Sequence, residues 1–361
     1  MQNKKNIALL IGNLKDRAGS ERIVADTANE FSEYNNVYIF VCGDKNTSYP
    51  INDNVKIISI TREIPIGKVK QIVWYLSFIL ALNKSCKRYK IDCIVSHWTK
   101  LSICLPFVGR DVKKWAHEHQ NDILLPLWLK KIKHMTYSKL DKISVLNITE
   151  QRNLKHTCNI YGVIIPGYVS NEFFTKENKN KNKNNKINKL LFVGRLVEEK
   201  QPLLLLELLK KSEFLLTDWE LDIIGSGPFY NEIENNIKNH FGSKVKLLTP
   251  RDLLNDYQES KYILITSKTE GFGLTIIEAM SQGCVPISFN CESGPKNIIS
   301  NNIDGFLLNT NEEFICMLNA IFNQTKKEYL FFSENALHKS TEYNYSDVMN
   351  IWNKQLGQLI K

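Results

Sequence analysis

Short apolar runs alternate with longer stretches of helical periodicity along most of the chain. Residues 7–12 (IALLIG) form a continuous apolar run, as expected of a strand buried on both faces of a parallel sheet. After them Ile23, Val24, Ala28 and Phe31 recur at helical spacing. The alternation continues with strands predicted at 37–41, 55–60, 93–96 and 143–146 and a long helix at about 67–89. This order predicts an α/β fold with a doubly wound parallel sheet.

The pattern is interrupted once and then resumes. Residues 175–189 (TKENKNKNKNNKINK) are almost entirely Lys and Asn, a composition that cannot bury a core and that is typical of a linker. Strands are predicted again at 190–193, 219–224, 245–248 and 262–265, and a final helix at 345–360. The chain is therefore expected to comprise a first domain at 1–174, a linker at 175–189, a second domain at 190–342 and a tail at 343–361.

Composition is consistent with two globular domains. The chain has 361 residues, of which 43% are hydrophobic and 24% charged, and no apolar run approaches the ~18 residues of a membrane span. The start, MQNKKNIALLIGNL, is interpreted as a first buried strand and not as a signal peptide. Eight cysteines without a C-x-x-C pair indicate reduced thiols and a cytoplasmic protein.

Positive charge is concentrated in the first half of the chain. Residues 1–170 carry 25 Lys and Arg against 14 Asp and Glu, whereas residues 171–361 carry 22 against 24. A basic first half favours an anionic partner, for which nucleic acid and an anionic membrane surface are the two candidates.

The most informative stretch is 262–287, YILITSKTEGFGLTIIEAMSQGCVPI. A buried strand leads into a glycine loop and then a helix that starts near Leu274, an arrangement whose free amides favour an anion. Glu270 and Glu278 flank the loop eight residues apart, or ~12 Å along a helix. Because the two carboxylates of a retaining glycosidase lie only ~5 Å apart, we interpret them as separate groups that grip different parts of one extended ligand.

The run EGFGLTIIE followed by AMSQGCVPI resembles the E-x7-E signature of the family-4 retaining glycosyltransferases, which have the GT-B fold. The resemblance implies that Glu270 faces the donor sugar and that Glu278 holds the ribose hydroxyls of the nucleotide. It also places the loop residues against the donor: Gly271, Phe272, Gly273 and Leu274. The alternative is that Glu270 caps a helix and Glu278 is a solvated helix residue.

The segment GRLVEEK resembles the diphosphate clamp of the same family. The resemblance implies that Gly194 lines the donor site and that Arg195 and Lys200 offset the charge of the leaving nucleotide diphosphate. The alternative is a local charge pair with Glu198 or Glu199.

Two further loops of the second domain resemble donor-binding loops. Residues 225–228 (GSGP) resemble the family's G-x-G-P loop and bring in Gly227; Tyr230 at the third glycine position excludes a dinucleotide fingerprint. Pro250 and Arg251 follow a predicted strand at the position where the family's backbone contacts the nucleotide base.

The first domain keeps part of the family pattern. Its first loop, 13–22, has Ala18 in place of the first glycine but retains Gly19, whose backbone would approach the donor phosphates. The usual I-P-N-G appears as Ile165–Tyr168 (IPGY), without the Asn. These departures leave a catalytically silent binding protein as one alternative.

Three titratable residues, His117, Glu118 and His119, end a predicted strand. In the family a His at this position lies beside the reacting sugar, and we assign that place to His119, with His117 second. The alternative is a polar surface loop. The two histidines would share one face of the strand, but no third ligand is apparent, so no metal site is predicted.

Residues 123–142 combine large apolar side chains with lysines and could rest on an anionic membrane. One side would carry Ile123, Leu124, Leu127, Trp128 and Ile132, and the other Lys130, Lys131, Lys133 and Lys139. An ordinary domain-surface helix with a solvated basic side is the alternative.

The resemblance as a whole implies a GT-B protein: two Rossmann-like domains facing across a cleft, with the tail helix packed on the first. CESGPKNII at 291–299 is similar to enzymes that extend bacterial surface glycans. The expected activity is retaining transfer of a hexose or N-acetylhexosamine, from a UDP-sugar or other nucleotide-sugar, to a saccharide or lipid-linked saccharide. Because the chain has no D-x-D motif, no essential metal is expected. No other cofactor and no nucleic-acid partner are expected either. A nucleotide-sugar epimerase is the other alternative.

Overall fold

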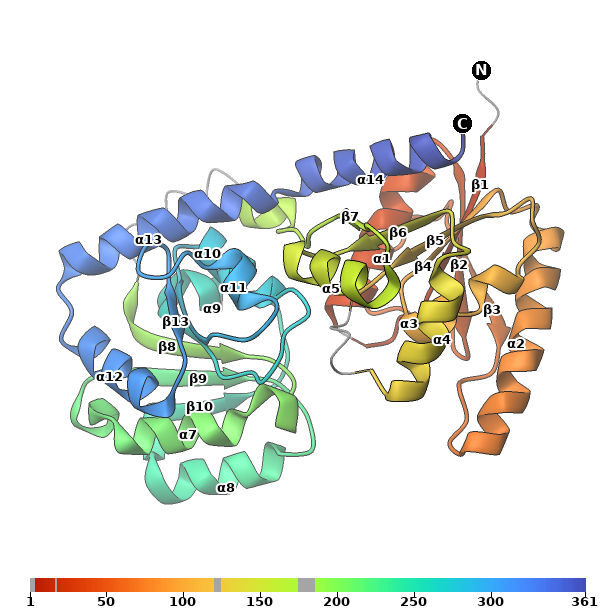
Figure 1. Cartoon of the computed structure of the whole chain (residues 1–361). Helices are drawn as coiled ribbons and strands as arrows, with labels where there is room; N and C mark the ends of the chain where they lie inside the picture. The colour runs from red at the N-terminus through yellow and green to blue at the C-terminus, as the bar shows by residue number, and fades with distance from the viewer. Residues whose placement is uncertain (1–3, 17, 120–124, 175–185) are drawn as a thin grey trace. The chain divides into compact units, whose positions relative to one another are not determined.

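We describe the chain from a computed structural model, which covers residues 4–16, 18–119, 125–174 and 186–361. These residues form two compact units, each built on a parallel sheet of its own (Figure 1). The first unit comprises Met1–Pro166 together with Ser346–Lys361, and the second comprises Gly167–Tyr345. The first unit is thus assembled from two separate segments of the chain.

The sheet of the first unit has the strand order β3-β2-β1-β4-β5-β6-β7, and all of its pairings are parallel. Sequence order reverses beside β1, so β1 and β4 are neighbours and the loops at their carboxyl ends meet. The strands are β1 (Asn6–Leu10), β2 (Asn36–Cys42), β3 (Lys56–Thr61), β4 (Cys93–Ser96), β5 (Lys113–His117), β6 (Lys142–Val145) and β7 (Val163–Ile164).

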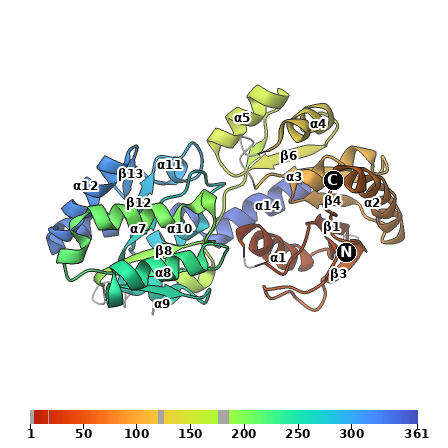
Figure 2. The same ribbon diagram turned by 90° about the horizontal axis from the view of Figure 1, so that it is seen from below.

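Helices cover both faces of this sheet. One face packs against α2, α3, α4 and α5 in a shared apolar core, and the other against α1 and α14, where the Phe31 and Trp352 rings lie 6.2 Å apart. Figure 2 shows α1 and α2 on opposite sides of the strands. The helices are α1 (Gly19–Ser32), α2 (Lys68–Arg88), α3 (Thr99–Ser102), α4 (Leu127–Tyr137), α5 (Ile148–Cys158) and α14 (Tyr345–Leu359).

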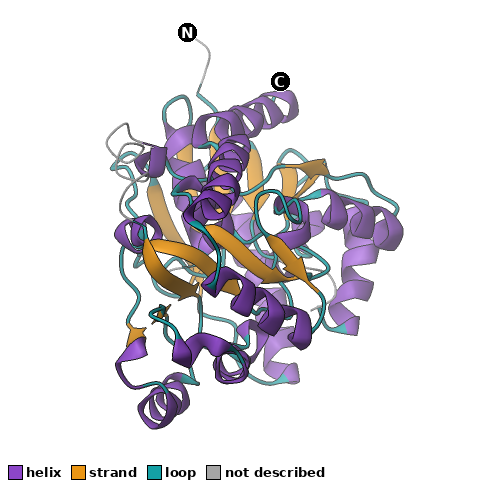
Figure 3. Ribbon diagram, turned by 90° about the vertical axis from the view of Figure 1, so that its left-hand side faces the viewer, coloured by secondary structure: helices purple, strands orange, loops and turns teal. Residues whose placement is uncertain are grey.

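The sheet of the second unit has the order β10-β9-β8-β11-β12-β13, again all parallel. Its orange strands lie between purple helices in Figure 3. Helices α7, α8 and α12 pack on one face through Leu205, Ile233 and Phe314. The strands are β8 (Ile187–Val193), β9 (Glu220–Ile224), β10 (Val245–Leu248), β11 (Ser260–Ile265), β12 (Val285–Phe289) and β13 (Phe306–Leu308). The helices are α7 (Pro202–Lys211), α8 (Tyr230–His240), α9 (Leu254–Glu259), α10 (Leu274–Ser281), α11 (Pro295–Ile298), α12 (Asn311–Phe322) and α13 (Lys326–Ser340).

The boundaries of the units differ from the expected domain limits. Residues 167–174 belong to the second unit, because the carbonyl of Phe173 accepts a hydrogen bond from Gln282 Nε2 at 2.7 Å and its ring lies 6.2 Å from Tyr257. Of the expected linker, residues 175–185 lie outside the described residues, and residues 187–189 already form the start of β8. From Ser346 the tail belongs to the first unit.

The predicted strands and the long helix correspond closely to β1–β4, β6 and α2, whereas α4 spans only 11 residues of the stretch 123–142. All eight cysteines are free thiols, and seven of them are buried. Among the described residues no helix has the length and apolarity needed to cross a bilayer.

Candidate functional site

The carboxyl end of β11 brings Lys200 and Glu270 into direct contact. Lys200 Nζ donates a hydrogen bond to Glu270 Oε1, and Ser267 Oγ donates to the same oxygen at 2.7 Å. The backbone carbonyl of Lys200 accepts a hydrogen bond from Thr266 Oγ1 at 2.9 Å. Thr266 directly follows β11, so this bond fixes the backbone of Lys200 to the end of that strand. The two side chains are 22% and 13% exposed. Because solvent reaches both side chains, a ligand can separate them. The ammonium of Lys200 can then bind an anionic group, and the carboxylate of Glu270 can accept hydrogen bonds from hydroxyl groups.

The loop after Glu270 turns directly into α10. Gly273 occupies the N-cap of that helix at φ +100°, a left-handed conformation that favours glycine, and no side chain caps the helix. Phe272 is buried beside Tyr343, with ring centroids 5.6 Å apart, and this contact fixes the loop. The first amides of α10, beginning with Leu274, therefore remain available at the positive end of the helix dipole.

Glu278 occupies α10 itself, one turn beyond its start. Its side chain is 5% exposed, and Oε2 accepts a hydrogen bond from the Tyr257 hydroxyl at 3.0 Å. Glu270 lies on the loop, whereas Glu278 lies on the helix, and each has its own protein partners. This arrangement suits two separate hydrogen-bonding groups and not a paired acid and nucleophile.

The glycine loops after β8 and β9 interlock through their backbones. Leu196 N donates to Ser226 O at 2.8 Å, and Gly194 N donates to Ile224 O at 3.1 Å. Gly227 has φ +155°, and a Cβ at this position would lie 2.5 Å from Leu196 O. Glycine is therefore required at residue 227 for the two loops to approach one another.

The remaining predicted residues of the second unit, Arg195, Pro250 and Arg251, differ in whether their side chains have partners within the protein. Arg195 is exposed, and among the described residues its side chain has no hydrogen-bond or ion-pair partner. Arg251 instead forms a two-pronged ion pair with Asp256, with Nε–Oδ2 and Nη2–Oδ1 distances of 3.1 and 2.5 Å. Pro250 is exposed beside it.

In the first unit, Gly19 is the first residue of α1. The N-cap of that helix, Ala18, has no side chain able to bond the first-turn amides. Ser20 Oγ donates to Glu21 Oε2 at 2.7 Å, which directs the Glu21 carboxylate back to the helix start. The first-turn amides of α1 thus have no N-cap side chain from Ala18, and the approach of the Gly19 backbone to the donor phosphates stays a prediction.

The strand-end histidines belong to a cluster of three. His97 Nδ1 lies 3.0 Å from His119 Nε2, and His117 Nδ1 lies 2.8 Å from Ser144 Oγ. His117 is 1% exposed, whereas His119 is the partly exposed member of the strand-end pair. Trp352 of α14 packs against the cluster, 5.7 Å from the His97 ring and 4.7 Å from the His117 ring.

Burial keeps all three imidazoles neutral. It lowers the pKa of His119 to about 3, and it lowers the pKa values of His97 and His117 well below the ordinary value, with smaller contributions from the neighbouring histidines. A neutral imidazole carries one N–H donor and one acceptor nitrogen. His119 can therefore offer a hydrogen bond to a ligand, but it cannot offer a positive charge at neutral pH.

The surroundings of His97 select the tautomer of His119. His97 Nε2 is buried and has no hydrogen-bond partner among the described residues. A proton on that nitrogen would leave a buried N–H unsatisfied, which costs about 1–3 kcal/mol. The proton is therefore better placed on His97 Nδ1, which donates to His119 Nε2 and leaves the His119 proton on Nδ1.

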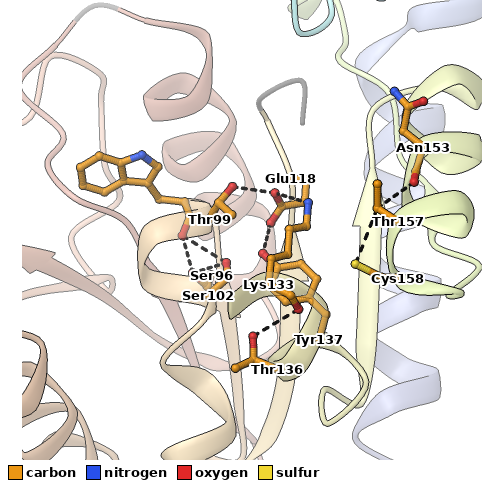
Figure 4. Close-up of polar contacts among 11 residues, drawn as sticks. Ser96, Thr99, Ser102, Glu118, Lys133, Thr136, Tyr137, Asn153, Thr157 and Cys158 are labelled. Carbon is orange, nitrogen blue, oxygen red and sulfur yellow. Dashed lines mark hydrogen bonds and ion pairs between the residues drawn. The ribbon is translucent and has the colours of Figure 1, made fainter. Parts of the chain in front are cut away.

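Glu118, which stands between His117 and His119 in the sequence, forms a buried ion pair with Lys133 (Figure 4). Lys133 Nζ of α4 lies 3.2 Å from Glu118 Oε2, and the two side chains are 4% and 3% exposed. Thr99 Oγ1 donates to the same carboxylate at 2.6 Å, and the Tyr137 hydroxyl donates to Oε1. The pair joins α4 to the end of β5, next to His119.

This ion pair corrects the prediction for residues 123–142. Lys133 was placed with the outward lysines, but it lies on the inner side of α4 with Leu129 and Tyr137. The reason is spacing, since residues four apart share a helix face. Leu127 and Trp128 are exposed as expected, while Ile123 and Leu124 lie outside the described residues.

His97 is the residue that the sequence reasoning missed. It directly follows β4, His119 lies two residues beyond the end of β5, and β4 and β5 are neighbours. Because the carboxyl ends of adjacent parallel strands meet at one edge, pairing these two positions would have found it. The described residues include no group of three or more His, Cys, Asp or Glu side chains arranged to hold a metal ion.

Known proteins resemble this chain over nearly its whole length. Residues 173–338 match the model of the family described as glycosyl transferases group 1. An uncharacterized glycosyltransferase of Haemophilus influenzae is 27% identical over 372 residues, which cover 96% of this chain and 99% of that protein. A Campylobacter jejuni enzyme named GalNAc-alpha-(1->4)-GalNAc-alpha-(1->3)-diNAcBac-PP-undecaprenol alpha-1,4-N-acetyl-D-galactosaminyltransferase is 23% identical, covering 98% of each chain.

The fold also has a close counterpart among solved structures. Alr3699/HepE of Anabaena, in complex with UDP and glucose, matches with a TM-score of 0.78 at 14% identity, covering 98% of this chain and 100% of that one. At this identity the likeness shows the shared fold alone.

Proposed function

Because the chain is a group 1 glycosyltransferase with the GT-B fold, we propose that it transfers a hexose or N-acetylhexosamine from a nucleotide-sugar to a saccharide. The observation that carries this proposal is the accessible Lys200–Glu270 pair at the end of β11, next to the uncapped start of α10. UDP is the proposed nucleotide, a choice supported by the UDP named for the Anabaena structure.

In this proposal the second unit holds the donor. Lys200 leaves Glu270 to bind the diphosphate, joined by Arg195, whose side chain is exposed and has no partner among the described residues. Glu270 then accepts hydrogen bonds from sugar hydroxyls, and Glu278 from the ribose. Gly194, Gly227 and the amides of the glycine loop approach the phosphates, while the backbone at Pro250 and Arg251 contacts the base.

Charge on the diphosphate grows as the sugar leaves, so cationic and amide donors stabilise the transition state more than the ground state. We propose that these donors take the place of a divalent metal, and that transfer retains the anomeric configuration without a covalent enzyme intermediate. His119, kept neutral by burial, contributes a hydrogen-bond donor to the reacting sugar through its Nδ1–H.

We further propose that the acceptor is a lipid-linked saccharide used in surface polysaccharide or lipopolysaccharide synthesis. Support comes from the undecaprenol-linked acceptor in the name of the Campylobacter jejuni relative. An acceptor of this kind requires the enzyme to work at a membrane surface, for which we propose the inner face of the cell membrane. The basic first unit is suited to such peripheral contact.

A panel of UDP-, GDP- and ADP-sugars tests the donor proposal by thermal shift. The stabilising sugar is then incubated with undecaprenyl-diphosphate saccharides, and the anomeric configuration of the product is read by NMR. We expect a UDP-sugar to stabilise wild type and to do so less in Glu270→Gln. Release of an altered free sugar or nucleotide without acceptor would instead indicate an epimerase, and an inverted product would refute retention.

A further inference from the structure

Helix α2 is apolar on both of its faces. Its inner face packs into the core of the first unit through Trp74, Phe78, Leu82 and Cys86. Its outer face carries a second apolar row, whose members are between 62% and 75% exposed: Val69, Ile72, Val73, Leu76 and Leu80. Their spacing of three or four residues aligns them along one side of the helix. A second apolar face contributes nothing to the core and indicates something outside the unit that covers it.

Basic residues bracket this row. The sequence of α2 contains five basic residues and no acidic one, with Lys68 and Lys70 at its start and Lys84, Lys87 and Arg88 near its end. Apart from Ser77, every exposed residue of α2 is apolar or basic. At ~1.5 Å per residue the helix is about 30 Å long, so the outer face forms an extended strip with positive ends.

We propose that the outer face of α2 lies on an anionic lipid surface. Aliphatic side chains at the centre would enter the boundary between headgroups and acyl chains, and the terminal Lys and Arg side chains would reach the headgroup phosphates. Only the role of this lipid contact, which is to bring the enzyme to a lipid-linked acceptor, rests on the proposed function. Binding itself does not depend on glycosyl transfer.

The neighbouring structure extends the same face. Phe107 is 59% exposed, and its carbonyl accepts a hydrogen bond from Asn83 Nδ2 of α2 at 2.9 Å. Helix α4, which packs on the same side of the sheet, also has no acidic residue and exposes Leu127 and Met135. An apolar and basic surface that continues across several elements fits a lipid plane better than a groove-binding peptide.

Charge argues against a second copy of this chain as the occupant. Two α2 helices placed face to face would bring ten positive charges together without a single carboxylate on either helix. The row also lacks Trp, Tyr and Arg at its centre, the residues that dominate tight protein interfaces. An anionic lipid surface satisfies both the apolar centre and the basic ends.

Flotation of the full chain with vesicles tests the proposal, in the absence of nucleotide-sugar. Vesicles contain either phosphatidylcholine alone or equal amounts of phosphatidylcholine and phosphatidylglycerol. We expect wild type to float with the anionic vesicles at low salt and the Ile72→Gln/Leu76→Gln variant to bind about tenfold more weakly. The control is Leu216→Gln, the same type of change at an 88% exposed position in the second unit, which should leave flotation unchanged.

A charge variant keeps the proposal testable if the glutamine variant folds poorly. Lys68→Glu/Lys70→Glu should reduce binding to anionic vesicles, and added salt should reduce the wild-type binding in the same way. Equal flotation of wild type and both α2 variants would overturn the proposal. A dimer in light scattering that the Leu76 substitution dissociates would overturn it in favour of a second copy. Because no sugar is transferred in this assay, loss of vesicle binding and loss of the proposed activity are distinguished.

Discussion

Replacing Lys133 by Met isolates a buried negative charge. The change keeps an unbranched side chain in the inner position of α4 but removes the ammonium 3.2 Å from Glu118. Glu118, whose side chain is 3% exposed, retains Thr99 and Tyr137 as donors but loses its countercharge. Removal of one partner from a buried pair destabilises by about 3–5 kcal/mol. The two remaining hydrogen bonds place our expectation at the lower end, about 3 kcal/mol.

Urea unfolding followed by tryptophan fluorescence measures this loss, because five of the six tryptophans lie in the first unit. The matched control is Lys113→Met, which breaks a Lys113–Asp141 pair of the same 3.2 Å length whose side chains are 49% and 28% exposed. Surface pairs contribute at most about 1 kcal/mol.

A second variant, Glu118→Gln/Lys133→Met, removes both charges; the amide oxygen accepts from one of the two hydroxyls, and the amide NH2 donates to the oxygen of the other hydroxyl, which can rotate. It should return to within about 1 kcal/mol of wild type. The reasoning fails if Lys133→Met loses no more stability than Lys113→Met, or if the double variant is as unstable as the single one.

Three further outcomes are expected. Lys200→Ala should lower kcat by about a hundredfold, or ~3 kcal/mol, in a transfer assay, and a loss below about tenfold would remove Lys200 from the diphosphate clamp. EDTA should leave transfer intact, whereas abolition with rescue by magnesium or manganese would refute the metal-free proposal. Since burial lowers the pKa values of His97, His117 and His119, the unfolded chain takes up their protons first as pH falls below ~6.5. Their stabilisation is thus full well above pH ~6.5 and decreases by about 1 kcal/mol per histidine as the pH falls from about 7.5 to 5.5, which urea unfolding at both pH values measures.

Local sequence predicts most of the architecture because the local and global signals agree. The apolar run at 7–12 and the long periodic stretch near 67–89 each have the length and composition of the element they form, β1 and α2. The glycine loop after β11 is predicted as well, since a strand, a turn and a helix follow within a dozen residues. The resemblance places Lys200 and Glu270, 70 residues apart, at one donor site, but their direct ion pair was not predicted from the sequence.

The missed features join separate elements. The hydrogen bond between His97 and His119 depends on the neighbour relation of β4 and β5, which no local pattern encodes. Lys133 is different, because Leu129, Lys133 and Tyr137 recur every four residues and already indicate an inward-facing row. Lysine is rarely buried without a partner. The row therefore predicts an inward-facing Lys133 only when Glu118 is recognised as its partner.

The position of Trp352 has a consequence for how the chain is made. This side chain is fully buried between Phe31, Trp115 and the histidine cluster, although it arrives with the last residues described. During synthesis the seven strands of the first unit emerge first, yet one face of their sheet has to wait for α14. The second unit, continuous in sequence, can complete its core earlier. The order in which the units complete their cores is thus the reverse of the order in which they are synthesised: the unit that emerges first is completed last.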